Sequence, residues 1–164
     1  MKIKTVRATP ILVPLEAPYV WSYGALDAFT KCVVEVETTD GVVGIGEAAY
    51  HVASVAAERF SVVTTLSVSV PVLEENLQRT GLAARCVRVR ASDVPVLELE
   101  NPESDARHKI EAEIQAALRL DGIGAIALGC AGMADLAADL TAQFKVPVID
   151  GVASAVRLAE AITA

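Results

Sequence analysis

The sequence predicts an α/β fold, a four-stranded parallel sheet flanked by helices, with an N-terminal antiparallel β-meander. From residue 60 onward, apolar strand-like segments alternate with helix-like segments, which is typical of a parallel sheet with crossover helices. Residues 2–48 instead alternate apolar and polar positions around a turn signal, as antiparallel strands do. The 164 residues are 53% hydrophobic but only 4% aromatic, a composition typical of soluble α/β domains. We therefore expect two domains, a meander over residues 1–47 and an α/β lobe over residues 48–164.

The first domain is expected to contain an edge strand, a loop and a hairpin. The segment KIKTVRATPILVPL, residues 2–15, predicts a strand that Pro10 and Pro14 confine to a sheet edge. Residues 16–29 predict a loop, and KCVVEVETTDGVVGIGEA, residues 31–48, predicts a hairpin that turns at Asp40-Gly41. The returning strand and a following helix compete for the same residues. We expect the strand to continue to about Ile45 and the helix to begin near Glu47.

The second domain is expected to contain four βα pairs. The first helix has a Ser at its cap, Pro71 in its first turn and Gly81 at its C-terminus. The other helices show Ala, Ile and Leu at helical spacing. The expected strands are residues 60–66, 86–90, 124–130 and 146–150, and the expected helices are residues 67–81, 103–120, 131–144 and 151–164.

Charge and hydropathy exclude two classes of partner. The formal net charge of −7 argues against nucleic acid, because phosphate binding requires clustered Lys and Arg. We interpret the one basic cluster, Arg85, Arg88 and Arg90, as the solvated edge of a strand. No apolar run reaches the length of about 18 residues that a membrane span needs, and the N-terminus lacks a signal-peptide core. We expect a cytoplasmic protein with no membrane partner.

Cysteine and histidine positions argue against a metal site. The three cysteines, Cys32, Cys86 and Cys130, are odd in number and lack CxxC spacing, which disfavours a disulfide framework or a zinc site. His51 and His108 lie far apart and are expected on helix surfaces or as satisfied side chains. We expect Cys32 and Cys86 to be core residues within strands, and we expect no metal site.

The candidate site lies at the carboxyl ends of the parallel strands. Ligands bind there in open parallel sheets, because loops and helix N-termini converge at that edge. Polar or reactive groups follow three strands, at residues 64–67, 129–132 and 150–151. We expect these three segments to line one rim.

Cys130 is the most informative residue of this rim. It lies between an apolar strand and an expected helix N-terminus, whose amides and dipole favour the thiolate by lowering the thiol pKa. A thiolate here could act as a base or a nucleophile, and the alternative is a small buried cysteine at a strand end. The hydroxyls of Thr65 and Ser67 suit a carboxylate, amide or imide, although Ser67 or Ser69 could instead cap the following helix.

Residues 43–164, and above all the motifs LGCAGMADL and VPVIDGV, closely resemble the second half of hydantoin and allantoin racemases of the Asp/Glu racemase superfamily. The resemblance implies one lobe of a two-lobed α/β enzyme that needs no cofactor. In that family each lobe contributes one cysteine to the cleft between the lobes. One cysteine removes the proton at the stereocentre, and the other returns a proton to the opposite face.

The resemblance also assigns roles to residues of this chain. Cys130 takes the place of the catalytic cysteine of the second lobe. The amides of Ala131 and Gly132 match the group that holds a substrate carbonyl or oxyanion. The substrate-binding loop of the second lobe is matched by Thr64, Thr65 and Ser67. The implied substrate is a small hydantoin or ureide-like ring. Val68 departs from the pattern, because these racemases often carry Arg at that position.

Residues 1–48 resemble a different family, the N-terminal capping domain of the mandelate racemase branch of the enolase superfamily. In that family a meander and its loop, here about residues 18–28, close over substrate bound in a separate barrel. The magnesium-binding acids and the catalytic bases lie on the barrel, which this sequence does not contain. The two resemblances together imply a chimera with its junction in VVGIGEA.

The expected function is that of a racemase lineage with one half-site. Racemisation by two groups needs one on each face of the substrate carbon, so a chain with one matching cysteine should have weak or no activity. The alternatives are a noncatalytic small-molecule binding or structural domain and, ranked lower, an enolase-type enzyme suggested by the N-terminal resemblance. Exposed apolar surface where the parent's other lobe would pack predicts a homo-oligomer.

Overall fold

The computed structural model describes residues 3–21, 24–38, 41–42, 45–101 and 103–163, with side chains for residues 46–101 and 103–161. The chain divides into two compact units, one of residues 1–43 with 162–164 and one of residues 44–161. Each unit is described by itself. Within the described residues, no helix is both long and apolar enough to cross a membrane.

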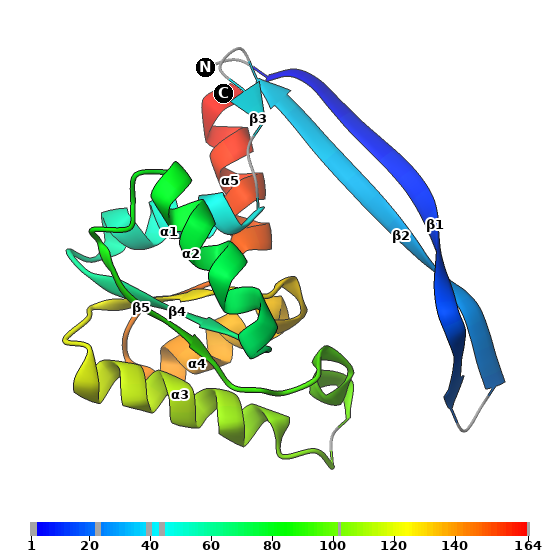
Figure 1. The fold of residues 1–164 in the computed structure, drawn as a ribbon. Coiled ribbons are helices and arrows are strands. Elements are labelled where there is room, and N and C mark those ends of the chain that lie inside the picture. Colours follow the sequence, from blue (N-terminus) through cyan, green and yellow to red (C-terminus); the bar gives the residue numbers. More distant parts are fainter. Residues whose placement is uncertain (1–2, 22–23, 39–40, 43–44, 102, 164) are drawn as a thin grey trace. The chain divides into compact units, whose positions relative to one another are not determined.

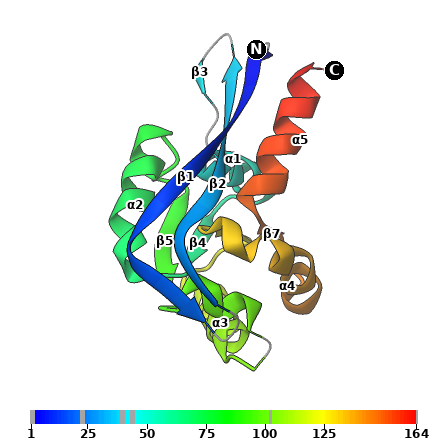
Figure 2. The same ribbon diagram turned by 90° about the vertical axis from the view of Figure 1, so that its right-hand side faces the viewer.

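The N-terminal unit is built from two long strands and a short one. Strands β1 (Ile3–Trp21) and β2 (Gly24–Thr38) run antiparallel, from the pair Ile3–Thr38 to the pair Trp21–Gly24 (Figure 2). Strand β3 (Gly41–Val42) pairs with the end of β2. The predicted loop over residues 16–29 is wrong, because most of it is extended in β1 and β2 with a register shift beyond Pro14. The predicted turn residue Asp40 and the side chain of Cys32 lie outside the described residues.

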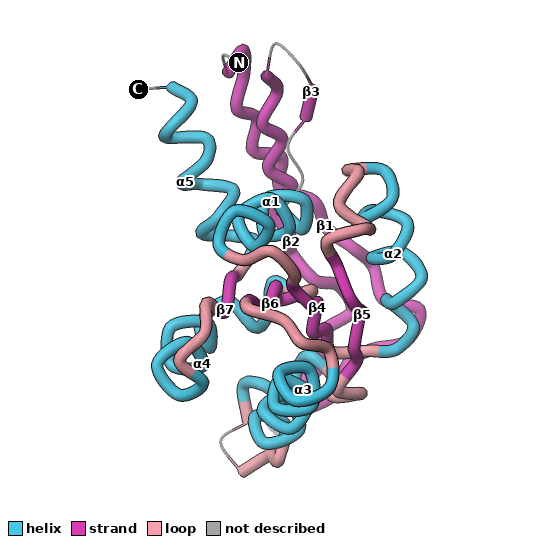
Figure 3. Tube along the Cα trace, turned by 90° about the vertical axis from the view of Figure 1, so that its left-hand side faces the viewer, coloured by secondary structure: helices cyan, strands magenta, loops and turns pink. Residues whose placement is uncertain are grey.

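The second unit contains a parallel sheet that includes β4 and β5 (Figure 1). Its four strands lie in the order β5-β4-β6-β7 (Figure 3). This confirms the predicted parallel sheet with alternating helices. The strands are β4 (Phe60–Thr64), β5 (Cys86–Ala91), β6 (Ala125–Leu128) and β7 (Val148–Ile149). The α-helices are α1 (Ile45–Ala56), α2 (Val70–Arg79), α3 (Ala106–Leu120), α4 (Ala137–Phe144) and α5 (Gly151–Thr163). Three 3-10 helices follow strand ends, η1 (Ser67–Ser69), η2 (Val96–Glu100) and η3 (Ala131–Leu136).

Helices cover both faces of this sheet, and each face has its own core. Helices α1 and α2 pack on one face, and α3 and α4 pack on the other (Figure 3). Side chains alternate between the faces along a strand, so Val62 belongs to the first core and its neighbour Val63 to the second. In the first core the rings of Tyr50 and Phe60 stack with centroids 6.3 Å apart. Burial on both faces explains why these strands read as continuous apolar runs.

Several helix boundaries differ from the sequence prediction, among them the start of α3, which is Ala106 and not residue 103. Ile45 begins α1 instead of ending the hairpin strand. The helix expected from residue 67 begins at Val70, directly before Pro71, and the Ser69 side chain at its N-cap makes no capping hydrogen bond. The helix expected over residues 131–144 is η3 followed by α4. The predicted role of Gly81 agrees with its φ of +73° just after α2, a conformation that glycine adopts without strain.

Candidate active site

The candidate site lies where the strand order of the sheet reverses. The chain passes from β4 to β5 on one side and then crosses to β6 on the other side of β4. The loops that leave β4 and β6 therefore diverge and leave a place for a ligand at the carboxyl edge. Thr64 ends the first of these strands and Thr65 follows it, while Gly129 and Cys130 follow the second. The fold thus brings together the 64–67 and 129–132 segments that the sequence predicted to share a rim.

Close packing joins the two segments at Gly129. Its amide donates to the Val63 carbonyl at 2.8 Å, and its carbonyl accepts from Thr64 Oγ1 at 3.4 Å. A Cβ on Gly129 would lie 3.0 Å from each of Thr64 Cβ, Val62 Cγ1 and Leu73 Cδ1. Such contacts are tighter than ordinary packing allows, so this position has no room for a side chain. Gly129 fixes the start of the Cys130 segment against the end of β4.

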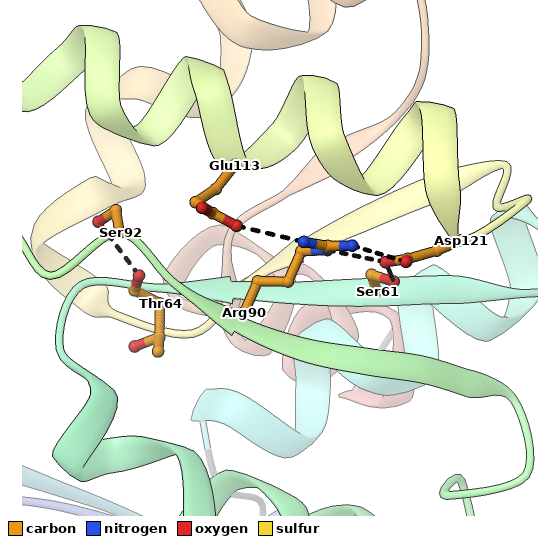
Figure 4. A network of polar contacts seen from close by, with 6 residues as sticks. All are labelled: Ser61, Thr64, Arg90, Ser92, Glu113 and Asp121. Carbon is orange, nitrogen blue, oxygen red and sulfur yellow. Dashed lines mark hydrogen bonds and ion pairs between the residues drawn. The ribbon is translucent and has the colours of Figure 1, made fainter.

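The threonines of the β4 loop are structural in large part. Thr64 and Thr65 are buried, with 1% and 3% of their surface exposed. Thr64 uses its hydroxyl on Gly129, and the carbonyl of Thr65 accepts from the Val94 amide at 3.0 Å. The Ser92 hydroxyl lies 3.3 Å from the Thr64 carbonyl (Figure 4). The segment that follows β5 therefore holds the β4 loop in place.

Ser67 is the exposed member of the β4 loop. Its amide donates to Asp93 Oδ1 at 3.0 Å, and Asp93 has a φ of +53°. This bond uses the backbone of Ser67 and leaves its hydroxyl at an exposed position of the carboxyl edge. The N-cap position of α2 belongs to Ser69, so the alternative that Ser67 caps this helix is wrong. Ser67 is better placed for a ligand than either threonine.

Cys130 is a partly buried free thiol at the end of β6. Its backbone is extended, with φ −137° and ψ 130°, and its carbonyl accepts from the Met133 amide at 3.1 Å. The six residues of η3 follow it where an α-helix was expected, and α4 begins only at Ala137. The first amides of a helix have no carbonyl partner inside it, so the N–H groups of Ala131 and Gly132 are suited to an acceptor on a ligand. Both residues are exposed.

Gly132 brings η3 into contact with η2. A Cβ on Gly132 would lie 2.8 Å from Val96 Cγ1, 3.6 Å from Leu99 Cδ1 and 3.7 Å from Cys130 Sγ. A side chain at this position would therefore displace Val96. Sequence reasoning missed η2 as part of the site, because it lies about 30 residues before Cys130 and carries no chemically reactive group.

Asp150, the third expected rim segment, caps α5. Its Oδ1 accepts from the Ala153 amide at 2.7 Å, and its carbonyl accepts from the Ser154 hydroxyl at 2.6 Å. An aspartate that binds the third amide of a helix in this way stabilises the helix start. The carboxylate also borders a groove on α5 lined by Ala134, Asp135, Val152, Val156 and Arg157. We interpret Asp150 as structural.

A buried ion pair, which the sequence did not predict, joins β5 to the end of α3. Arg90 binds Asp121 through Nη2 to Oδ1 at 2.7 Å and Nε to Oδ2 at 2.9 Å, and Ser61 Oγ donates to the same carboxylate (Figure 4). The Arg90 and Asp121 side chains are 9% and 2% exposed. The hydrogen bond from Arg90 is the main reason that the pKa of Asp121 lies below its usual value. Glu113 is a further partner of Arg90, at 3.4 Å.

The prediction that Arg85, Arg88 and Arg90 form the solvated edge of a strand is therefore wrong for two of these three residues. Arg90 is buried in the ion pair just described. Arg85 donates to the carbonyls of Ser54, Ala57 and Glu58 at the end of α1. Such bonds satisfy carbonyls that a helix leaves without a partner at its C-terminus. Arg88 is exposed on β5 and agrees with the prediction.

The other cysteine side chain that the structure describes, Cys86, and the two histidines do not join the site. Cys86 packs partly buried against the first core, as predicted, and burial is the main cause that raises its pKa to about 11. His51 on α1 and His108 on α3 are exposed. Across the described residues, no group of three or more His, Cys, Asp or Glu side chains could hold a metal ion. Cys130 is thus the thiol that the fold places at the carboxyl edge.

Comparison with protein families gives a match over most of the chain. The model described as Asp/Glu/Hydantoin racemase matches residues 37–159. A protein named hydantoin racemase from Rhizobium meliloti is 47% identical over 121 residues, which cover 74% of this chain and 50% of the relative. A hydantoin racemase from Pseudomonas sp. (strain NS671) is 40% identical over 127 residues, or 77% of this chain and 51% of the relative.

Solved structures give a similar result. An allantoin racemase from Klebsiella pneumoniae matches with a TM-score of 0.71 and 45% identity, covering 73% of this chain and 49% of that one. The allantoin racemase from Pseudomonas fluorescens matches with a TM-score of 0.70 and 43% identity, covering 73% of this chain and 51% of that one. The chain therefore spans about half the length of the relatives it matches.

Proposed function

The chain belongs to the Asp/Glu/hydantoin racemase family, and from this premise we propose that it forms one half of a cofactor-independent racemase site for a hydantoin or ureide-like ring. Cys130 is the acid/base group, and the amides of Ala131 and Gly132 bind a ring carbonyl. Ser67 contacts the ring from the β4 loop, while Thr64 and Thr65 shape that loop from within. The observation that carries this proposal is the position of a free thiol beside η3 at the reversal of strand order.

The proposed chemistry is a proton transfer at the ring carbon C5. The thiolate of Cys130 takes the C5 proton while the electrons of the C–H bond move into the neighbouring carbonyl. Hydrogen bonds from Ala131 and Gly132 stabilise the oxyanion that forms. Inversion then requires an acid on the opposite face of C5, because Cys130 reaches one face.

We propose that the half-site has one acid/base thiol, because no second cysteine among the described side chains lies at the carboxyl edge. Cys86 lies on β5 against the first core, and its raised pKa keeps its thiol protonated. Among the side chains that the structure describes, Cys130 is therefore the thiol available for proton transfer at the candidate site. We expect weak or no racemisation by this chain alone, and exchange of the C5 proton on one face instead.

Circular dichroism decay of an enantiopure 5-substituted hydantoin tests the half-site. We expect the circular dichroism signal of the hydantoin to decay little faster with the chain than in buffer. Any acceleration should be lost in Cys130→Ala and kept in the matched control Cys86→Ala. Racemisation at an ordinary enzymatic rate that depends on Cys130 would overturn the half-site. Acceleration that Cys130→Ala leaves unchanged would remove Cys130 from the mechanism.

Deuterium exchange in D2O separates proton removal from inversion. A one-face site removes the C5 proton, exchanges it with solvent and returns a deuteron to the same face. We expect NMR to show deuterium entering C5 faster than optical activity is lost, above the rate in buffer. Equal rates of exchange and loss of optical activity would indicate two working groups and contradict the proposal.

A second candidate function, a noncatalytic small-molecule binding domain, follows from the same half-site. It is favoured by the presence of one described thiol at an edge where the Ser67 hydroxyl and the amides of Ala131 and Gly132 could bind a ligand. Saturable binding of a hydantoin without deuterium exchange would select it over the half-site.

The origin of residues 1–47 remains a separate proposal. We propose that they form an antiparallel meander of different descent, resembling the enolase-superfamily cap, joined to a racemase lobe in a cytoplasmic homo-oligomer. The family match begins at residue 37, so it already includes the last residues of this segment. Size-exclusion chromatography with light scattering tests the oligomer, and a monomer at all concentrations would contradict it.

A further inference from the structure

The segment that follows β5, residues 92–94, holds the β4 loop by three hydrogen bonds of one length. Two are main-chain bonds of 3.0 Å that the carbonyls of Thr64 and Thr65 accept. Any residue other than proline could donate them. The third runs from the Ser67 amide to Asp93 Oδ1, also at 3.0 Å, and it requires a side chain that ends in an acceptor. The hold on Ser67 is thus the part of this attachment that depends on residue type.

Asp93 makes this contact from a strained backbone. Its φ of +53° lies in the left-handed region, which is unfavourable for a residue with a Cβ. Asp and Asn tolerate this region better than other such residues. Strained residues of this kind are common at ligand clamps, where the surrounding structure keeps them in place. The result here is a carboxylate directed at a residue of the candidate site, 26 positions earlier in the sequence.

The bond between Ser67 and Asp93 affects position more than stability. Both residues are exposed, so water competes for the amide and for the carboxylate, and the net gain in folding free energy is small. The hydroxyl of a serine is separated from its own amide nitrogen by only two carbon atoms. A fixed amide therefore restricts the space that the Ser67 hydroxyl can reach at the carboxyl edge.

From these contacts we propose that Asp93 is a positioning residue, which holds Ser67 so that the Ser67 hydroxyl meets the ring, and that its strained backbone is kept for the site and not for the stability of the fold. The inference rests on the racemase half-site, because the contact between Ser67 and the ring belongs to that proposal. Asp93 acts through Ser67 and does not itself touch the ring. A hydroxyl that is already held in place loses less freedom when the ring binds.

Two variants of Asp93 separate position from stability. Asp93→Gly removes the carboxylate and relieves the strain, because glycine adopts positive φ freely. We expect calorimetry to give a Kd for 5-benzylhydantoin about three- to tenfold weaker than in the wild type, the range of one hydrogen bond. The urea midpoint should stay at or above the wild-type value. Asp93→Asn keeps an oxygen acceptor, so its Kd should stay within about twofold of the wild type.

Lys145 provides a matched control for the glycine substitution. It ends α4 with a φ of +58°, outside the candidate site. Lys145→Gly relieves the same kind of strain, and we expect it to raise the urea midpoint and leave Kd unchanged. Equal weakening of Kd in Lys145→Gly and Asp93→Gly would overturn the positioning role.

A double-mutant cycle tests whether Asp93 acts through Ser67. Ser67→Ala keeps the amide that donates to Asp93 and removes the hydroxyl. In this background we expect Asp93→Gly to change Kd by less than about twofold, because residues that act through each other have non-additive effects. An equal effect of Asp93→Gly in both backgrounds would overturn the inference.

The outcomes also separate this inference from the proposed function. A Kd that Asp93→Gly leaves unchanged, or a weaker Kd that comes with a lower urea midpoint, would overturn the positioning role and leave the half-site standing. Absence of saturable binding of 5-benzylhydantoin by the wild type would overturn the proposed function, and this inference with it.

Discussion

Arg90 and Asp121 form a bidentate ion pair between β5 and the end of α3, with nitrogen–oxygen distances of 2.7 and 2.9 Å. Removing one partner of a buried pair leaves the other charge without compensation. We expect Asp121→Ala to lower the free energy of unfolding by about 3–5 kcal/mol, measured by urea denaturation. Asp139→Ala removes an exposed partner of Arg107, and this variant should change the free energy of unfolding by less than about 1 kcal/mol. Similar effects of the two variants would contradict a structural role for the buried pair.

The same carboxylate should give stability a dependence on acid pH. The pKa of Asp121 is lowered in the folded protein, chiefly by the hydrogen bond from Arg90. Its ionised form therefore stabilises the fold above the unfolded pKa of about 3.9, and this contribution is lost as pH falls through the lower folded value. We expect the urea midpoint to fall more steeply below about pH 4 in the wild type than in Asp121→Asn. Asp139→Asn is the control that should keep the wild-type slope.

Alanine substitutions at Gly129 and at Gly46 should change the stability of the protein in opposite directions. A Cβ on Gly129 would meet three atoms at 3.0 Å, so we expect Gly129→Ala to destabilise the protein by about 1–3 kcal/mol. A Cβ on Gly46 would meet Tyr50 Oη at 3.9 Å, an ordinary contact within α1. Gly46→Ala should therefore stabilise by about 0.5–1 kcal/mol, through the lower entropy of the unfolded chain. Thermal and urea unfolding measure both effects, and a stable Gly129→Ala protein would show that β6 can move away from β4.

The thiol of Cys86 should be alkylated slowly in the folded protein. Its pKa of about 11 means that about one thiol in a thousand is ionised at pH 8, and the thiolate is the reactive form. We expect iodoacetamide to modify Cys86 more than about a hundredfold more slowly than an unperturbed cysteine with a pKa of about 8.5. Mass spectrometry of the folded and urea-unfolded chain at pH 8 gives the two rates. Equal rates would show that Cys86 is not protected by burial.

The parallel sheet could be predicted because its signal is local. Strands buried on both faces read as apolar runs, and each is followed by residues at helical spacing. Helix boundaries were less predictable. Nothing in AGMADL distinguishes a 3-10 helix from an α-helix, and the structure places a 3-10 helix there. Ile45 fits either a strand or a helix by its own preference, and the structure places it in α1.

The sequence predicts where the candidate site lies in the fold, but it does not predict the contacts that its polar groups make. The position of Cys130 after a strand could be predicted, because the residues before it form an apolar run. The burial of Thr64 was not predictable, because its hydroxyl binds Gly129, which lies 65 residues further along the chain. The pairing of Arg90 with Asp121, 31 residues apart, likewise leaves no spacing pattern to find. Contacts between distant residues therefore decide which polar groups remain for a ligand.

The strand order also determines how copies of this lobe can meet. Strands β5 and β7 are the two edges of the sheet, and an open edge invites pairing with a strand from another molecule. Strand β7 has two residues, and Thr141 Oγ1 accepts from the Val148 amide at 3.0 Å, which uses a donor that a foreign strand would need. Strand β5 carries the exposed charge of Arg88, which repels its own copy. Both edges are thus protected against sheet extension, so the lobe should resist edge-to-edge aggregation.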